Sequence, residues 1–225
     1  MLQLSCDLKY IIPIITFWQR VYSEILKYKP DPVVTNNIVT NNIVSSIHCV
    51  SYILHYNYDY NINYYIHLSI GYYIYDTLYM LSRFISDYKQ QNKEYIHIVY
   101  ITHHLSAVYI LYEILTGENK DFLLKGYNLT ELSNIMLYIS FHINKVYAHH
   151  VYLNILTDFI HLLWYSYIRV FILAAFMYNS LYSLHLSICT RIILSIIYSI
   201  GLGWCYLLVK RNMTNLHTLI KSKDD

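Results

Sequence analysis

The chain has 225 residues, of which 56% are hydrophobic, 17% are aromatic and only 13% are charged. Its 16 lysines and arginines against 14 aspartates and glutamates give a formal net charge of +2. This composition excludes a disordered chain, which needs low hydrophobicity and high charge. It also argues against a water-exposed globule, which needs about twice this share of charged residues. There is no basic excess of the kind that marks a nucleic-acid-binding protein.

Six stretches have the length and apolarity of a membrane-spanning helix, which needs about 20 mostly apolar residues. In chain order they are 39–56, 64–86, 95–115, 121–143, 151–176 and 185–209. A seventh stretch, 8–26, is weaker because it contains Pro13 and Arg20. Strands seldom run beyond about ten residues, so length favours helices despite the many β-branched and aromatic residues. We therefore predict an all-α fold, a polytopic transmembrane bundle of six to seven helices around a polar-lined cavity.

The gaps between these stretches are short and polar, which indicates a single domain. We expect residues 1–37 to form an N-terminal segment with a weak first transmembrane helix, residues 38–210 a transmembrane domain and residues 211–225 a polar cytoplasmic tail. Basic residues in short loops mark the cytoplasmic side of a membrane protein. With seven spans, the side of the C-terminus collects nine of them and the opposite side three. The nine are Lys27, Lys29, Lys89, Lys93, Lys145, Lys210, Arg211, Lys221 and Lys223, and the three are Lys9, Lys120 and Lys125.

Ionisable side chains at membrane depth cost at least ~2.5–3.5 kcal/mol each, so those in the predicted spans need a partner or a function. Helical spacing places several of them on common faces. One polar stripe, within an arc of about 80° at 100° per residue, consists of Asn154, Asp158, His161, Tyr165 and Arg169. A second stripe consists of Glu131, Asn134, Tyr138 and His142. We expect both stripes, together with His48, to face the interior of the bundle.

His103 and His104 are adjacent in the stretch 95–115 and point about 100° apart on a helix. A histidine pair permits proton transfer or nucleophilic attack, and we expect Asp76 or Glu131 to be the carboxylate that orients one of the rings. The alternative is that these groups only bond neighbouring helices together, which is worth about 0.6 kcal/mol on average. The sequence has no His/Cys cluster with zinc spacing and no nucleotide-binding motif. We therefore expect no metal and no cofactor.

Five short motifs, in order along the chain, resemble the TLC domain, which is shared by TRAM, ceramide synthases and a set of small membrane proteins. They are Asn42 with Ser45 and His48, Gly71 with Tyr72 and Asp76, the pair His103-His104, the run Glu131-Leu132-Ser133-Asn134, and Arg169 in YSYIRV. The resemblance covers about residues 38–210. The frequent Ile, Asn, Tyr and Lys, typical of an AT-rich genome, are similar to the residue usage of TLC-domain proteins from giant DNA viruses.

The resemblance implies a multi-pass protein of the endoplasmic reticulum or another endomembrane of the host cell, with a cytoplasmic C-terminus. It implies that the chain binds or handles membrane lipid, and so affects lipid composition, sensing or trafficking. The implied catalytic set is His103, His104 and Asp76. The implied cavity-lining residues are His48, Glu131, Asn134, Asp158, His161 and Arg169, with Arg169 contacting a lipid headgroup or a carboxylate.

Two alternatives stay open. The first is a ceramide-synthase-like acyltransferase with acyl-CoA as co-substrate, in which His103 or His104 is the general base. Ceramide synthases carry a second His-His eight residues upstream, where this chain has Tyr95 and Ile96, so the closer likeness is to the small TLC-domain proteins. The second is a non-catalytic interaction or chaperone-like protein. Expected partners are membrane lipid and, in addition, a second copy or another membrane protein, with no nucleic acid.

Overall fold

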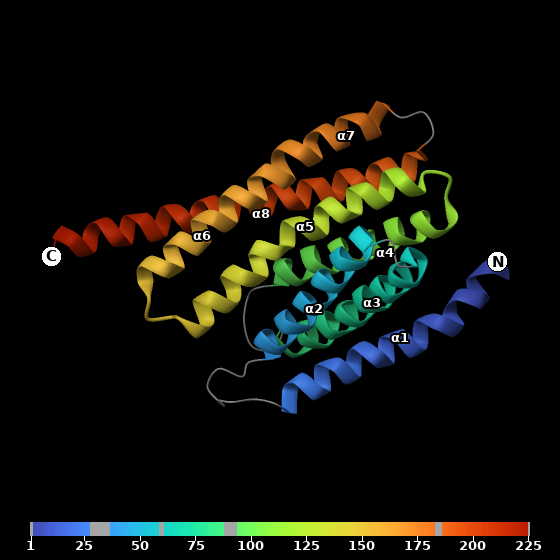
Figure 1. Cartoon of the computed structure of the whole chain (residues 1–225), viewed down its shortest axis with the longest axis horizontal. Helices are drawn as coiled ribbons and strands as arrows, with labels where there is room; N and C mark the ends of the chain where they lie inside the picture. The colour runs from blue at the N-terminus through green and yellow to red at the C-terminus, as the bar shows by residue number, and fades with distance from the viewer. Residues whose placement is uncertain (1, 28–36, 59–60, 88–93, 183–185, 225) are drawn as a thin grey trace.

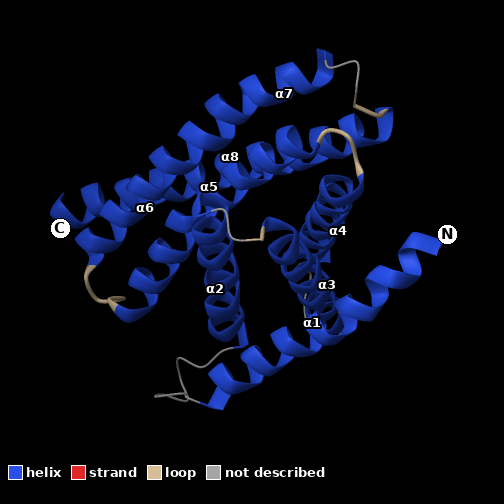
Figure 2. Cartoon of the chain, turned by 45° about the vertical axis from the view of Figure 1, so that its right-hand side comes forward, coloured by secondary structure: helices blue, strands red, loops and turns tan. Residues whose placement is uncertain are grey.

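The computed structural model describes residues 2–27, 37–58, 61–87, 94–182 and 186–224, and nearly all of them are helical (Figure 2). In chain order the helices are α1 Leu2–Lys27, α2 Asn37–Tyr58, α3 Ile62–Asp87, α4 Glu94–Thr116, α5 Lys120–Val146, α6 Val151–Ser166, the π-helical η1 Tyr167–Ile172, α7 Leu173–Tyr182 and α8 Ile188–Asp224. No strand occurs among the described residues. The prediction of an all-α fold is therefore confirmed.

Each apolar stretch of the sequence coincides with a helix. The weak stretch 8–26 belongs to α1, which continues through Pro13. At the other end of the chain, α8 runs for 37 residues and passes position 210 without a break. At 1.5 Å per residue it is about 55 Å long, which exceeds the ~30 Å hydrocarbon core of a bilayer. Of the basic residues used to predict orientation, Lys29, Lys89 and Lys93 lie outside the described residues.

Three helical segments within the described part of the chain are long and apolar enough to cross a membrane. They are Ile98–Thr116 in α4, Val151–Tyr182 and Ile188–His217 in α8. The segment Val151–Tyr182 is one continuous rod formed by α6, η1 and α7. Length and composition thus fit a membrane protein. The helices α1, α2, α3 and α5 have 22 to 27 residues, which is long enough to cross a bilayer, but they do not reach the same apolarity.

The helices pack so that α5 lies in the middle of the bundle. It contacts α2, α4 and α6, and through η1 and α7 it also contacts the rest of the rod. On one side α3 packs between α1 and α4, and on the other side α8 packs against α4, α6 and α7. Figure 1 shows α1 along one edge and the α6–α7 rod lying across α8 at the opposite edge. Polar residues on α5 therefore meet neighbours from both halves of the chain.

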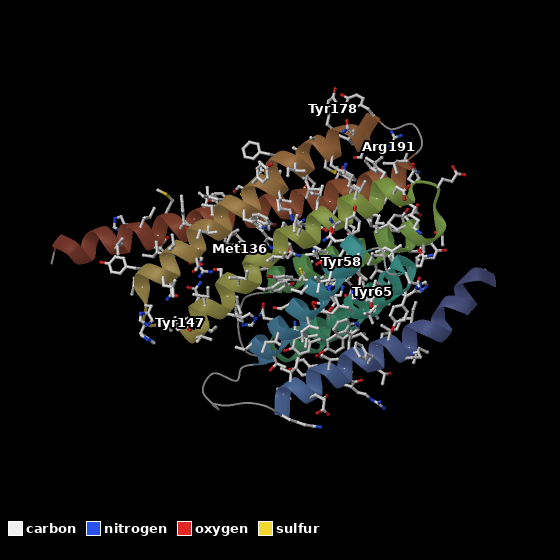
Figure 3. The ribbon with its side chains drawn as sticks, in the orientation of Figure 1. Tyr58, Tyr65, Met136, Tyr147, Tyr178 and Arg191 are labelled. Atoms are coloured by element: carbon white, nitrogen blue, oxygen red, sulfur yellow. The ribbon has the colours of Figure 1, made fainter. Side chains whose placement is uncertain are left out.

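The interior of the bundle is unusually polar and its surface unusually apolar. Among the described side chains, 20 polar or charged residues are buried beside 22 apolar ones. Large apolar side chains such as Ile188 (76%) and Phe171 (69%) are instead exposed. Tyr147 and Tyr178 are exposed near opposite ends of the molecule (Figure 3), as in the tyrosine belts at membrane surfaces. Polar groups inside and apolar groups outside are the arrangement expected when the surrounding solvent is hydrocarbon.

Two close contacts fasten α1 to α3. Trp18 Nε1 donates a hydrogen bond to the Leu68 carbonyl at 3.0 Å, and the Trp18 ring is buried. Gly71 packs directly under Ile14, where an added Cβ would lie only 2.9 Å from the Ile14 Cβ. Because that atom is anchored next to the backbone, it cannot move aside as the tip of a long side chain could. Glycine at position 71 is therefore what allows α1 to approach the bundle.

We expect Gly71→Val to destabilise the protein by about 1–3 kcal/mol, the usual cost of overpacking a close contact. Gly203→Val is the matched control, because a Cβ at Gly203 meets no atom within 4 Å. The measurement is thermal unfolding of both variants in the same detergent. Equal transition temperatures for the two variants would show that α1 does not depend on the Gly71 contact.

Candidate functional site

The carboxylate of Asp76 joins three helices inside the bundle. On α3, its Oδ1 accepts a hydrogen bond from Asn41 Nδ2 of α2 at 2.9 Å. Its Oδ2 lies 3.6 Å from His104 Nε2 of α4. One turn earlier on α3, the Tyr72 hydroxyl donates to Ser45 Oγ of α2 at 2.7 Å. All of these side chains are buried, so the group forms a closed polar contact between α2, α3 and α4.

The second buried carboxylate, Glu131 of α5, is connected to the first through an aromatic residue. The Tyr73 hydroxyl of α3 donates to Glu131 Oε1 at 2.5 Å. The Tyr127 hydroxyl lies 3.5 Å from the Tyr73 hydroxyl, and the centroids of the Tyr73 and His104 rings are 5.3 Å apart. Asp76, His104, Tyr73 and Glu131 therefore form one connected layer that crosses α3, α4 and α5.

His48 lies in an aromatic stack on the α2 side of this layer. Its ring is parallel to the Tyr72 ring at a centroid distance of 4.0 Å, and its Nε2 is 2.9 Å from Ser69 Oγ. The Trp18 ring packs edge-on against the His48 ring, and the two ring centroids are 5.8 Å apart. With its bonding and stacking partners in place, His48 belongs to the packing between α1, α2 and α3.

Arg169 extends from the π-helical turn η1 to the middle of α5. Its Nε donates to Ser133 Oγ at 2.7 Å, and its Nη2 lies 3.3 Å from the Thr130 carbonyl and 3.5 Å from Asn134 Oδ1. Only 1% of the residue is exposed. Within the described structure, Nη1 has no hydrogen-bond partner. The contacts of this guanidinium with α5 are therefore all to neutral groups, and one of its nitrogens is unused.

A cavity of about 40 Å³ lies beside Arg169, between α4, α5, η1, α7 and α8. This is room for a few water-sized groups. Its polar wall consists of Tyr73, His103, Tyr127, Thr130, Arg169 and Tyr198. The remainder is apolar and consists of Ala107, Ile110, Leu123, Gly126, Leu173, Phe176, Met177, Leu194 and Ile197. His103 Nδ1 is buried and finds no partner among the described groups, while its ring packs edge-on against Trp204 at 5.0 Å.

The structure separates the predicted site residues into those at this cavity and those behind it. His103 and Arg169 line the cavity. His104, Asp76, Glu131 and Asn134 lie behind the wall and bond to wall residues or to one another. The expected lining by His48, Glu131 and Asn134 is not found at this cavity, whose wall is largely apolar. The physical reason is that buried polar groups gain more by bonding to each other than by facing an unfilled space.

Asp158 and His161 belong to a second cluster that does not line the cavity. Asp158 Oδ1 accepts hydrogen bonds from Ser140 Oγ at 2.7 Å and from Asn144 Nδ2 at 2.8 Å, both on α5. Its Oδ2 pairs with Arg211 Nη2 at 2.8 Å and accepts from Asn215 Nδ2 at 3.1 Å, both on α8. This carboxylate therefore clamps α5, α6 and α8 together. His161 is buried one turn further along α6.

Sequence reasoning missed several residues of the site. Tyr73 was not singled out, although it lies between Tyr72 and Asp76 in a motif that was noticed. It is one of 28 tyrosines, most of which pack or anchor, and no spacing rule distinguishes it. Thr130 and Trp204 were missed as well, because their parts depend on which helix packs beside them.

The arrangement can hold a ligand that is polar at one end and apolar at the other. Arg169 and His103 line the cavity and each have a nitrogen without a partner in the described structure, and α7 and α8 contribute mainly apolar lining residues. Among the described residues, no three His, Cys, Asp or Glu side chains come together in a way that could hold a metal ion. The chemistry available at the cavity is hydrogen bonding, charge pairing and, at His103, proton transfer.

Comparison of the chain with protein-family models, curated proteins and solved structures gives no match. The likeness to the TLC domain therefore rests on the five motifs of the sequence. Its consequences for function remain predictions that the geometry of the cavity must support.

We expect Asp158→Ala to destabilise the protein by about 2–4 kcal/mol, because the buried Ser140 and the half-buried Asn144 lose their acceptor. Asp121→Ala, which removes an exposed carboxylate from the first turn of α5, is the matched control and should change little. Thermal or denaturant unfolding in detergent measures both variants. A similar loss for the two variants would contradict the assignment of Asp158 as a helix clamp.

Proposed function

We propose that this chain is a multi-pass membrane protein of the TLC-domain type, and that it binds lipid in the cavity between α4, α5, α7 and α8. One observation supports this most strongly. His103 and Arg169, each of which has a nitrogen without a hydrogen-bond partner among the described groups, line a cavity whose remaining lining is largely apolar. That combination suits a molecule with a polar head and an alkyl chain. Binding would serve membrane lipid composition, sensing or trafficking.

The multi-pass part of the proposal extends beyond the three most apolar helices. The polar residues that distinguish α2, α3 and α5 from those helices include Asn41, Asp76 and Glu131, and all three are buried between helices. A helix whose polar groups are paired inside a bundle can cross a bilayer despite a modest mean hydropathy. The lengths of the helices and the nine-to-three distribution of basic residues support six or seven crossings and a cytoplasmic C-terminus. The proposed endomembrane location rests on the resemblance to the TLC domain.

The orientation can be tested with short N-glycosylation acceptor tags on the full-length protein in microsomes. We expect a C-terminal tag to remain unmodified because it faces the cytoplasm. We expect an N-terminal tag to be glycosylated if α1 is a seventh span. Glycosylation of the C-terminal tag would contradict the proposed orientation, and an unmodified N-terminal tag would reduce the number of spans to six.

In this proposal the polar layer behind the cavity positions the residues at its wall. His103 donates or accepts a hydrogen bond at the head of the ligand. The pair of Asp76 and His104, directly behind it, fixes α4 against α3, and Glu131 holds the Tyr73 ring at the wall. Asp76, His104 and Glu131 therefore act on the ligand through His103 and Tyr73.

We expect His103→Ala to weaken lipid binding about tenfold, the effect of losing one or two hydrogen bonds in a buried site. Full-length wild-type and variant proteins in nanodiscs would be stripped, and the lipids that remain bound identified by mass spectrometry. His149→Ala is the matched control, since His149 is exposed in the connection between α5 and α6. If His103→Ala retained the same bound lipid as the wild type at equal stability, His103 would be a helix contact and the non-catalytic interaction protein would be favoured.

A second candidate function, acyl transfer from acyl-CoA to a lipid amine or hydroxyl, is favoured by one observation. His103 lines the cavity, its Nδ1 has no partner among the described groups, and its ring centroid lies 5.7 Å from that of His104, which pairs with Asp76. This is a suitable place for a general base. His103 would take the proton of the amine or hydroxyl while that group attacks the thioester carbonyl, and the thiolate of coenzyme A would leave with a proton. Product formation by the purified protein that is lost in His103→Ala would favour this function, and binding without turnover would favour the first.

A further inference from the structure

We propose that the ligand head bound in the cavity is a carboxylate, and that the ligand is a single-chain long-chain fatty acid whose carboxylate pairs with Arg169. The inference rests on the proposed lipid-binding function and specifies the chemical class of the lipid. Its basis is the unbalanced charge of Arg169, the shape of the polar wall and the apolar wall that continues from it.

Arg169 is a buried cation, and its contacts within the described residues include no carboxylate. Its partners Ser133, Thr130 and Asn134 are neutral, and its Nη1 has no partner in the described part of the chain. Of the buried carboxylates, Asp158 pairs with Arg211 and Asp76 lies 3.6 Å from His104 Nε2. Glu131 accepts a hydrogen bond from the Tyr73 hydroxyl, and no ion pair to it occurs among the described residues. A charge at this depth is costly unless it is paired. The missing counter-ion is therefore expected to come from the molecule that occupies the cavity.

The charge and size of the cavity favour a carboxylate over other anionic heads. One guanidinium is neutralised by a single negative charge, whereas a phosphate monoester carries nearly two at neutral pH. Asp76 and Glu131, buried behind the wall, would repel the excess. A carboxylate has two oxygens that can accept hydrogen bonds from two donors, and Arg169 and His103, two lining residues of the same cavity, each have a nitrogen without a partner in the described structure. A free volume of about 40 Å³ suits a small planar group.

The apolar wall favours a single alkyl chain beyond this head. Leu173, Phe176 and Met177 contribute to it from the rod, and Leu194 and Ile197 from α8. These side chains offer apolar contacts to an alkyl chain. A molecule with one chain and a small charged end fits this arrangement, whereas a two-chain phospholipid presents a larger head and a second chain.

The test compares two probes of equal chain length on the full-length protein in nanodiscs. Palmitate has the carboxylate and hexadecanol has a neutral hydroxyl, and empty nanodiscs give the background partitioning of each probe. We expect the wild-type protein to bind palmitate at least about tenfold more tightly than hexadecanol, because charge-assisted hydrogen bonds are the strong ones. This ratio requires no variant, so it holds even if a substitution at position 169 prevents folding.

We expect Arg169→Gln to lose most of this preference while binding hexadecanol as the wild type does. Arg191→Gln is the matched control. Arg191 lies where α7 ends and α8 begins (Figure 3), contacts the Leu181 carbonyl and does not line the cavity. Thermal unfolding of both variants in the same nanodiscs shows whether the comparison is between folded proteins.

Three outcomes would overturn the inference, and each is distinguishable from the others. If palmitate and hexadecanol bind equally well and Arg169→Gln affects neither, the cavity binds lipid but does not select a carboxylate. If lysophosphatidate binds more tightly than palmitate, the head is a phosphate. If no probe binds above the background of empty nanodiscs, the proposed lipid-binding function fails together with the inference.

Discussion

The cost of placing charged and hydrogen-bonding groups in hydrocarbon explains most of the internal structure of this protein. A surface as apolar as that of α7 and α8 leaves polar side chains only one favourable location, which is between helices. There each must find a partner, and three of the charged groups illustrate the result. Asp158 is surrounded by four donors from two helices, Asp76 has Asn41 and His104, and Arg169 has three neutral acceptors and a nitrogen left over.

These three groups differ in how much hydrogen-bonding capacity remains for a ligand. The Asp158 cluster uses both oxygens of its carboxylate, so it fixes the spacing of α5, α6 and α8 and has little left to offer a ligand. The layer of Asp76, His104, Tyr73 and Glu131 is also largely occupied, but its edge reaches the cavity through the Tyr73 ring. Other buried polar atoms, among them His104 Nδ1, the Tyr52 hydroxyl and His161 Nε2, also have no hydrogen-bond partner among the described groups. Arg169 and His103 differ from them in that both also line the cavity, which makes the cavity the candidate site.

Sequence patterns predicted the helices and the residues that face inward, since both follow from the period and apolarity of a single segment. The stretch 151–176 and the polar stripe from Asn154 to Arg169 are examples, with Asp158, His161 and Arg169 all buried in the structure. The pattern could not predict that Asp158 bonds three helices together while Arg169, on the same stripe, lines the cavity. That difference depends on which neighbour lies opposite each residue, and helical arithmetic describes rotation about one axis only. The role of Tyr73 was not predictable for the same reason. The π-helical turn that carries Arg169 was not predictable either, because a regular helical period of 3.6 residues does not describe it.

The turn η1 makes the long rod from Val151 to Tyr182 sensitive to its number of residues. A chain shortened by one residue between Tyr167 and Ile172 would still form a helix of nearly unchanged hydropathy. Residues before and after the deletion would nevertheless rotate by about 100° relative to each other. Asp158 could then not keep its partners on α5 and α8 while Phe176 kept its stacking on Phe122. In this segment, insertions and deletions are therefore more damaging than exchanges of one apolar residue for another.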